Sequence, residues 1–135
     1  MACLMAGAAG MSGASFAKRV FIGGGIYGVL GVAPMYFLES RVGTDMPPAI
    51  NHPEFFYGFI GVTLAWQLAF LVIGTDPMRY RPLMLPAMVE KLSFVAAIVI
   101  LFAQGRVHVP LLLGAAGDFV LLVLFVMAWL RTRPQ

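Results

Sequence analysis

Charged side chains and cysteines are scarce in this chain of 135 residues. It holds nine basic and six acidic residues, so that 11% of the chain is charged, against about 25% in soluble proteins. A water-soluble domain of this size needs a polar surface, which this composition does not supply. That excludes a soluble globular enzyme, a disordered chain and a nucleic-acid-binding domain. The single cysteine, Cys3, excludes an intrachain disulfide framework and a metal site built from several thiolates.

Apolar residues make up 61% of the chain and gather in runs long enough to cross a bilayer. We expect spans at about 20–38, 55–75, 83–103 and 109–130, because a helix rises about 1.5 Å per residue and the hydrocarbon core is about 30 Å thick. Lipid cannot hydrogen-bond a bare backbone, and these runs lack the alternation of a barrel strand. The sequence therefore predicts an all-α fold: a four-helix transmembrane bundle forming a single membrane domain over residues 17–133, preceded by a flexible N-terminal tail at 1–16.

Basic residues predict how the bundle is oriented. They precede the first span, separate the second from the third and follow the fourth, at Lys18, Arg19, Arg79, Arg81, Arg131 and Arg133. The positive-inside rule places these segments, and with them both termini, in the cytoplasm. The opposite face then carries a long loop from Glu39 to Glu54, whose prolines should make it stiff rather than helical.

Polar side chains recur near the middle of every expected span. They are Tyr27, Trp66, Gln67, Glu90, Lys91 and Asp118, and by helical rise they lie within about 5 Å of one plane. An unpaired charge at this depth costs about 2.5–3.5 kcal/mol. We therefore expect a Glu90–Lys91–Asp118 cluster, or at least a Lys91–Asp118 pair. Gln67 and Tyr27 should donate hydrogen bonds to it, and all six residues are candidate ligand-binding residues.

Other interpretations of this layer stay open. Glu90 and Lys91 are also compatible with the membrane interface. Lys91 shares a helix face with Val95, Ile98 and Phe102, which is typical of a lipid-facing position, and a long side chain can snorkel to the headgroups. Asp118 has no such route, and it fits either a hydrogen-bonded structural role or a ligand or proton role. Trp66 is unusual at this depth and either lines a pocket or fills core volume.

Glycines on the first span predict close helix packing. Gly24 and Gly28 form a GxxxG pair, and Gly31 extends the same face, so that a neighbouring helix can approach closely. The neighbour is either another helix of the same bundle, which we favour, or a helix of a second copy in a dimer.

A second polar group belongs to the outer face and consists of Glu39, His52, Glu54 and His108. Two imidazoles and a carboxylate could bind a transition metal, but their spacing matches no metal motif. We expect ordinary interfacial polar residues and no metal. No cofactor is implied, because the sequence has no phosphate-binding loop, no nucleophile elbow and no paired histidines for haem.

The layout resembles the small four-helix bacterial inner-membrane proteins called DoxX-like. The resemblance rests on Arg19 followed by the glycine-rich first span, on Glu90-Lys91-Leu92 in the third span, and on Asp118 and Arg131-Thr132-Arg133 in and after the fourth. It covers about residues 17–133, mostly as architecture. DoxX proteins are associated with quinone-linked sulfur oxidation, as a membrane subunit beside others. The resemblance thus implies a bacterial membrane accessory subunit, and it implies no catalytic residue.

Three functions are compatible with these observations. The leading hypothesis is an accessory or scaffold subunit of a membrane complex, or a homodimer, with a lipid or quinone bound between its helices. The second is a membrane-embedded enzyme acting on a lipid or isoprenoid, with Asp118 or Glu90 as general acid/base. The third is a small proton-coupled transporter that uses the same acids.

The expected partners are therefore the lipid bilayer and an apolar small molecule, and not a nucleic acid, with the bacterial inner membrane as the location. An Asp118 tightly paired with Lys91 in a filled bundle would favour the scaffold. A ligand-sized void at Trp66, Gln67 and Asp118 would favour binding or catalysis.

Overall fold

The computed structural model describes the backbone of residues 2–133 and the side chains of residues 12–133. The elements are α1 (Ala2–Val32), η1 (Ala33–Phe37), α2 (Glu39–Asp45), α3 (Pro53–Thr75), η2 (Arg81–Leu83), α4 (Met84–Ala103) and α5 (Val109–Arg131). No strand occurs in this part of the chain. The segments Ser12–Phe37, Pro53–Thr75, Arg81–Ala103 and Val109–Arg131 are long and apolar enough to cross a membrane. The predicted all-α bundle of four spans is therefore confirmed, and the chain is a membrane protein.

Proline and glycine set where the long helices begin and end. The α-helical part of α1 ends at Val32, shortly before Pro34, which has no N–H to continue the ladder. Pro53 and Pro110 lie in the first turns of α3 and α5, where a missing N–H costs nothing. Just after α4, Gly105 has a φ of 68°, the left-handed conformation that commonly closes a helix.

The long loop between α1 and α3 is partly helical, which corrects the expectation of a stiff, non-helical segment from Glu39 to Glu54. Residues Glu39–Asp45 form the short helix α2. The prolines of this loop begin only at Pro47, so they leave the first half free to be helical. An acid in the first turn and an ion pair between Arg41 Nε and Asp45 Oδ2, 3.5 Å apart, are both compatible with a helix.

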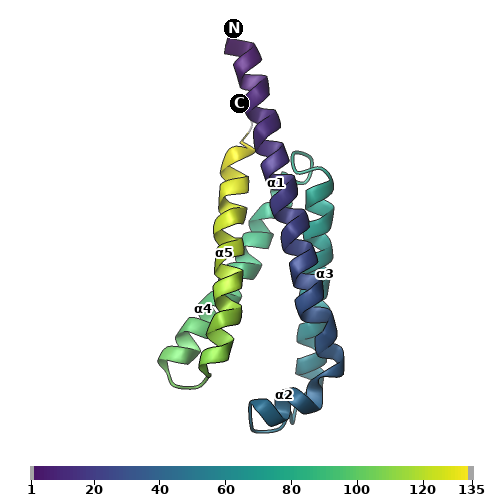
Figure 1. Ribbon diagram of the computed structural model, residues 1–135, viewed down its shortest axis with the longest axis vertical. Helices are drawn as coiled ribbons and strands as arrows, with labels where there is room; N and C mark the ends of the chain where they lie inside the picture. The colour runs from purple at the N-terminus through teal and green to yellow at the C-terminus, as the bar shows by residue number, and fades with distance from the viewer. Residues whose placement is uncertain (1, 134–135) are drawn as a thin grey trace.

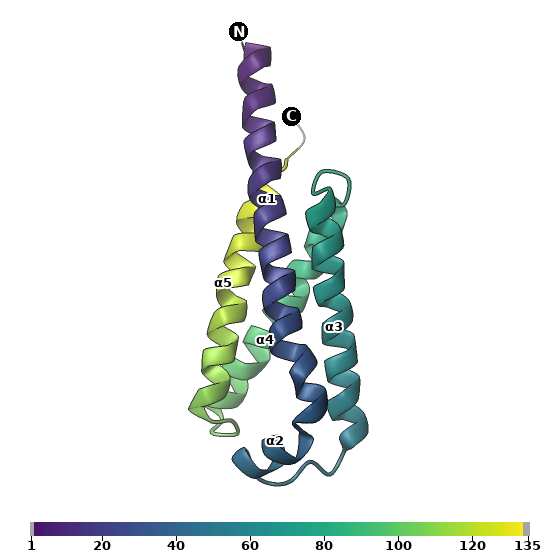
Figure 2. The same ribbon diagram turned by 45° about the vertical axis from the view of Figure 1, so that its right-hand side comes forward.

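Residues that precede the first expected span are also helical, because α1 begins at Ala2. The early turns of α1 extend beyond the ends of the other helices (Figures 1 and 2). The flexibility expected of residues 1–16 stays a prediction, and the Cys3 side chain lies outside the described side chains.

The long helices form two pairs, α1 with α3 and α4 with α5, whereas α3 and α4 contact each other little. Both chain ends lie at one end of the bundle, here called the terminal end, and α2 lies at the opposite, distal end (Figure 1). The two pairs are close together near the terminal end and diverge toward α2, as Figures 1 and 2 both show. The bundle is thus closed at one end and splayed at the other.

A phenylalanine stack fills the terminal half of the bundle. The rings of Phe21 on α1 and Phe125 on α5 stack 4.2 Å apart, and Phe70 on α3 meets Phe125 edge-on at 4.9 Å. Helix α4 adds Met84 and Ala87, and all five side chains are fully buried. Dispersion and close packing therefore hold all four spans together at this end.

The glycine face of α1 packs within the bundle. A Cβ atom on Gly24 would contact Leu121 and Phe125 of α5, and one on Gly28 would collide with Gln67 of α3. A Cβ on Gly31 would meet nothing within 4 Å. The GxxxG pair therefore lets α3 and α5 approach α1, as the favoured interpretation predicts, while Gly31 faces open space.

Candidate functional site

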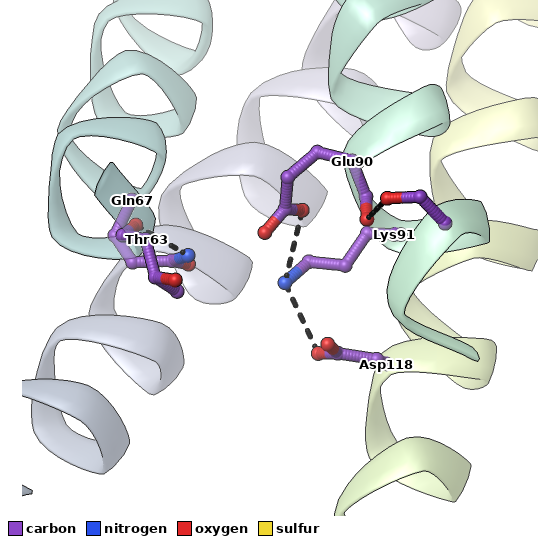
Figure 3. Close-up of polar contacts among 6 residues, drawn as sticks. Thr63, Gln67, Glu90, Lys91 and Asp118 are labelled. Atoms are coloured by element: carbon purple, nitrogen blue, oxygen red, sulfur yellow. Dashed lines mark hydrogen bonds and ion pairs between the residues drawn. The ribbon is translucent and has the colours of Figure 1, made fainter. Parts of the chain in front are cut away.

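The charged residues of the spans form one cluster. Lys91 Nζ lies 3.0 Å from Asp118 Oδ1 and 3.3 Å from Glu90 Oε2 (Figure 3). Glu90 and Lys91 are neighbours on helix α4, and Asp118 lies on α5. The cluster thus joins the two helices of the α4–α5 pair. The predicted Glu90–Lys91–Asp118 cluster is thus confirmed as a set of ion pairs.

Burial decides against the interfacial interpretation of Lys91. Its side chain is only 3% exposed. Of the neighbours expected on the same lipid-facing side, Ile98 is buried as well, whereas Phe102 is exposed. Nζ also lies 5.3 Å from the centre of the Phe70 ring. The ammonium therefore points into the bundle, on the distal side of the phenylalanine stack. Two carboxylates and an aromatic face compensate for its desolvation there.

Gln67 and Tyr27 do not donate to this cluster, which corrects that part of the expectation. Gln67 Nε2 donates instead to the carbonyl of Thr63, one turn back on its own helix, at 3.0 Å. No hydrogen bond or ion pair joins Tyr27 to the charged residues in the described part of the chain. Tyr27 nevertheless reaches α5 close to Asp118, because a Cβ atom on the preceding residue, Gly117, would stand 2.6 Å from the Tyr27 hydroxyl oxygen.

A cavity of about 700 Å³ occupies the space left by the splay. All four spans line it, including every residue of the predicted mid-membrane layer: Tyr27, Trp66, Gln67, Glu90, Lys91 and Asp118. Its remaining wall is mainly apolar, with Phe59, Phe94 and Leu111 among the side chains. This volume is within the range of about 300–1,000 Å³ that is usual for small-molecule sites.

The cavity is open rather than enclosed, and the phenylalanine stack limits it on one side. The three rings of Phe21, Phe70 and Phe125 are fully buried on the terminal side of the ion pairs. On the other side, Val62 of α3 and Val89 of α4 both line the cavity and are exposed. Since α3 and α4 barely touch, the cavity opens between them, on a face of the bundle that lipid covers in a bilayer.

The ion pair of Asp118, expected of a scaffold, and the ligand-sized void, expected of a binding protein, occur together in this bundle. Asp118 is paired with Lys91, and a ligand-sized void adjoins it at Trp66 and Gln67. Trp66 lines the void and also packs against Phe70, with ring centres 6.3 Å apart. The bundle is filled in one half and hollow in the other, so pairing and binding are not exclusive here.

Several wall residues were not among the predicted site residues. Gly31 and Gly114 belong to the wall, and a Cβ atom on either would meet nothing within 4 Å. Phe59 of α3 and Phe94 of α4 also belong to the wall and stack on each other there, with ring centres 6.3 Å apart. Helical spacing could have found Thr63, four residues before Gln67, as its hydrogen-bond partner. No sequence signal separates a glycine beside a void from a glycine beside a helix.

The outer-face residues form separate contacts rather than one site. His52 Nδ1 lies 2.9 Å from Glu54 Oε1, and Glu39 accepts a hydrogen bond of 2.6 Å from Tyr57. His108 immediately precedes α5, in the other distal turn. The described residues contain no group of three His, Cys, Asp or Glu side chains placed to hold a metal ion.

The comparisons with known proteins give no relative for this bundle. The chain matches no family model, no curated protein and no solved structure. Its function has to be argued from the cavity and the charged cluster themselves.

Proposed function

We propose that this membrane protein is an accessory subunit of the bacterial inner membrane that binds a small amphiphile, of the lipid or quinone class, between its four spans. The carrying observation is the cavity of about 700 Å³, which has an apolar wall and one charged corner. A site of this kind suits a molecule with one polar group and an apolar body, because each part finds a matching surface. The opening between α3 and α4 supports entry from the bilayer.

Orientation and assembly follow from the surface. The basic residues of the terminal end support a cytoplasmic location for both termini. Gly23 and Gly58 have no atom within 4 Å of where their Cβ would stand, which leaves room for a helix of another subunit or of a second copy. Together with the DoxX-like resemblance, this supports a role within a homodimer or a larger membrane complex.

A membrane-embedded enzyme is the second candidate, because both carboxylates reach the cavity. The side chains of Glu90 and Asp118 are 16% and 18% exposed, and both line its wall. A general acid/base within reach of a bound lipid or isoprenoid is therefore available. Against this, both carboxylates are engaged by Lys91. The transporter has the least support, since it needs a path to each face and the stack of Phe21, Phe70 and Phe125 fills the terminal half.

Trp66 provides a direct test of ligand binding. The chain has two tryptophans, of which Trp66 lines the cavity and Trp129 packs under Arg81 outside it. In a Trp129→Phe background, decylubiquinone or a brominated lipid added to the protein in nanodiscs should quench Trp66 emission saturably. A ligand that reaches the cavity contacts the indole, whereas one that stays in the lipid does not.

Gly31→Leu and Gly23→Leu form a matched pair of variants for this test. Both replace a helical glycine of α1 with no atom near its Cβ, but only Gly31 lines the cavity. Gly31→Leu should weaken the quenching by about tenfold or more, since it fills part of the site, and Gly23→Leu should leave it unchanged. Equal quenching in both variants, or none in the parent protein with any amphiphile, would overturn the proposal. Turnover of an added lipid or isoprenoid, lost in Asp118→Asn, would favour the enzyme.

A further inference from the structure

The polar surface that the cavity presents to a ligand consists mainly of hydrogen-bond acceptors. Lys91 is 3% exposed, because its Nζ is held between Asp118 and Glu90, whereas the two carboxylates are 18% and 16% exposed. Figure 3 shows the ammonium between the two carboxylates, reached by ion pairs from both sides. A ligand therefore meets carboxylate oxygens before it meets the ammonium.

Gln67, on the opposite side of the cavity, holds a buried acceptor without a partner among the described residues. Its Nε2 donates to the Thr63 carbonyl, which can only accept, so the orientation of the amide is fixed. The other amide atom, Oε1, is buried and has no hydrogen-bond partner in the described part of the chain, and the side chain is 1% exposed. Oε1 lies against Gly28 of α1, where an added Cβ atom would collide with it. A buried acceptor without a partner is unfavourable, so it calls for a donor or a positive charge.

The charges that face the cavity do not balance. Helix α4 contributes Glu90 and Lys91, α5 contributes Asp118, α1 contributes the neutral Tyr27, and α3 contributes no ionisable residue to the wall. Two carboxylates and one ammonium leave a formal charge of −1 beside apolar walls, where an unbalanced charge is costly. The ring of Trp66 also lines the wall, and the face of an indole attracts cations.

We infer that the amphiphile bound by this cavity is a lipophilic monocation, whose ammonium-type head lies beside Glu90 and Asp118 and whose apolar tail lies along Phe59 and Phe94. The inference rests on the proposed function, and it specifies the ligand of that same site. A cation neutralises the excess carboxylate charge. A fatty acid or an anionic phospholipid head would instead add a second unbalanced negative charge.

Three amphiphiles with one chain and different heads test this inference. They are (6-bromododecyl)trimethylammonium, 6-bromododecan-1-ol and 6-bromododecanoate, whose bromine lies about half-way along the chain and so within reach of Trp66, each titrated into nanodiscs of zwitterionic lipid that hold the Trp129→Phe protein. Because bromine quenches tryptophan at short range, loss of Trp66 emission reports on binding in the cavity. The cation should reach half quenching at a mole fraction about tenfold lower than the alcohol, and the carboxylate should bind more weakly than either.

Removal of one carboxylate should remove the preference. Glu90→Gln or Asp118→Asn brings the formal charge of the cluster to zero, so the cation and the alcohol should then differ by less than about threefold. Glu54→Gln is the matched control, because it removes an exposed carboxylate that is paired with His52 outside the cavity, and it should keep the full preference. If Asp118→Asn does not fold, Glu90→Gln still allows the measurement, because it retains the ion pair between Lys91 and Asp118.

The possible failures of the two proposals differ. If the three heads quench equally in the parent protein and Gly31→Leu weakens all of them, the cavity binds amphiphiles without regard to charge, and the cation inference is wrong. If the preference for the cation persists unchanged in Glu90→Gln and Asp118→Asn, it is wrong as well. If none of the three quenches Trp66, the proposed binding function itself is wrong.

Discussion

Lys91→Met should destabilise the bundle strongly, because it removes the cation from between two buried carboxylates. Nζ lies 3.0 Å and 3.3 Å from its two partners, and each attraction is worth about 5 kcal/mol at an effective dielectric constant of about 20. Much of this is offset by the desolvation of the three groups. Removal of one partner from a buried pair nevertheless costs about 3–5 kcal/mol, since it leaves the other charges uncompensated.

The assay is thermal stability in one detergent, measured as the monodisperse fraction that survives heating. A loss of 3–5 kcal/mol should lower the midpoint by about 10 °C or more. Lys18→Met is the control, because Lys18 is an exposed lysine on α1 with no ion pair within the described residues. It should melt within about 2 °C of the parent protein, as exposed charges contribute little.

A neutral triple variant separates charge from packing. In Glu90→Gln/Lys91→Met/Asp118→Asn the same side-chain volumes are nearly kept and the formal charges are all removed, so most of the lost midpoint should return. If the triple variant melts as low as Lys91→Met, the loss comes from packing of the lysine stem and not from unpaired carboxylates. A parent-like midpoint for Lys91→Met alone would refute the electrostatic argument altogether.

Three further predictions concern packing and orientation. Gly28→Ala should lower the same thermal midpoint, at a cost of about 1–3 kcal/mol, because its Cβ would collide with the Gln67 side chain. The control is Gly23→Ala, whose Cβ meets no atom within 4 Å. It should raise the midpoint slightly, because alanine has a higher helix propensity than glycine. Phe125→Ala should cost about 3–5 kcal/mol in unfolding measurements, since it removes the ring between two others in a fully buried stack, and a neutral result would contradict the view that the terminal half is the stable core. Reporters fused to either terminus should be active only when they are of the kind that works in the cytoplasm, and an active periplasmic reporter at either end would reverse the assigned orientation.

The spans and the charged cluster were predictable for one physical reason, the cost of polar groups in lipid. That cost makes a long uncharged run a helix, and it forces the few mid-membrane charges to face one another. Lys91 therefore had to find Asp118 once both lay at the same depth, unless it could snorkel. The sequence could not exclude snorkelling, because the length of the lysine stem permits both and only the burial of Lys91 decides.

The cavity was not predictable, because it depends on the angle between helix pairs. Gly24, Gly28, Gly31 and Gly114 look alike in the sequence, and each indicates only that a side chain is missing. Where the pairs converge, Gly24 and Gly28 let helices touch; where they diverge, Gly31 and Gly114 leave space.

Side-chain size on the opposing helices explains why the divergence lies at the distal end. In the terminal half a Cβ atom on Gly24 would contact Leu121 and the Phe125 ring, so the gap beside this glycine is filled. In the distal half, Gly31 and Gly114 have no opposing group within 4 Å of a Cβ. The large rings of Phe59 on α3 and Phe94 on α4 pair with each other there. An apolar void of this size forfeits dispersion contacts that a filled core would have. The cavity therefore lowers the stability of the bundle, and it lies beside a cluster with one carboxylate more than its single ammonium can balance. A ligand that fills the cavity and neutralises the extra carboxylate accounts for both features.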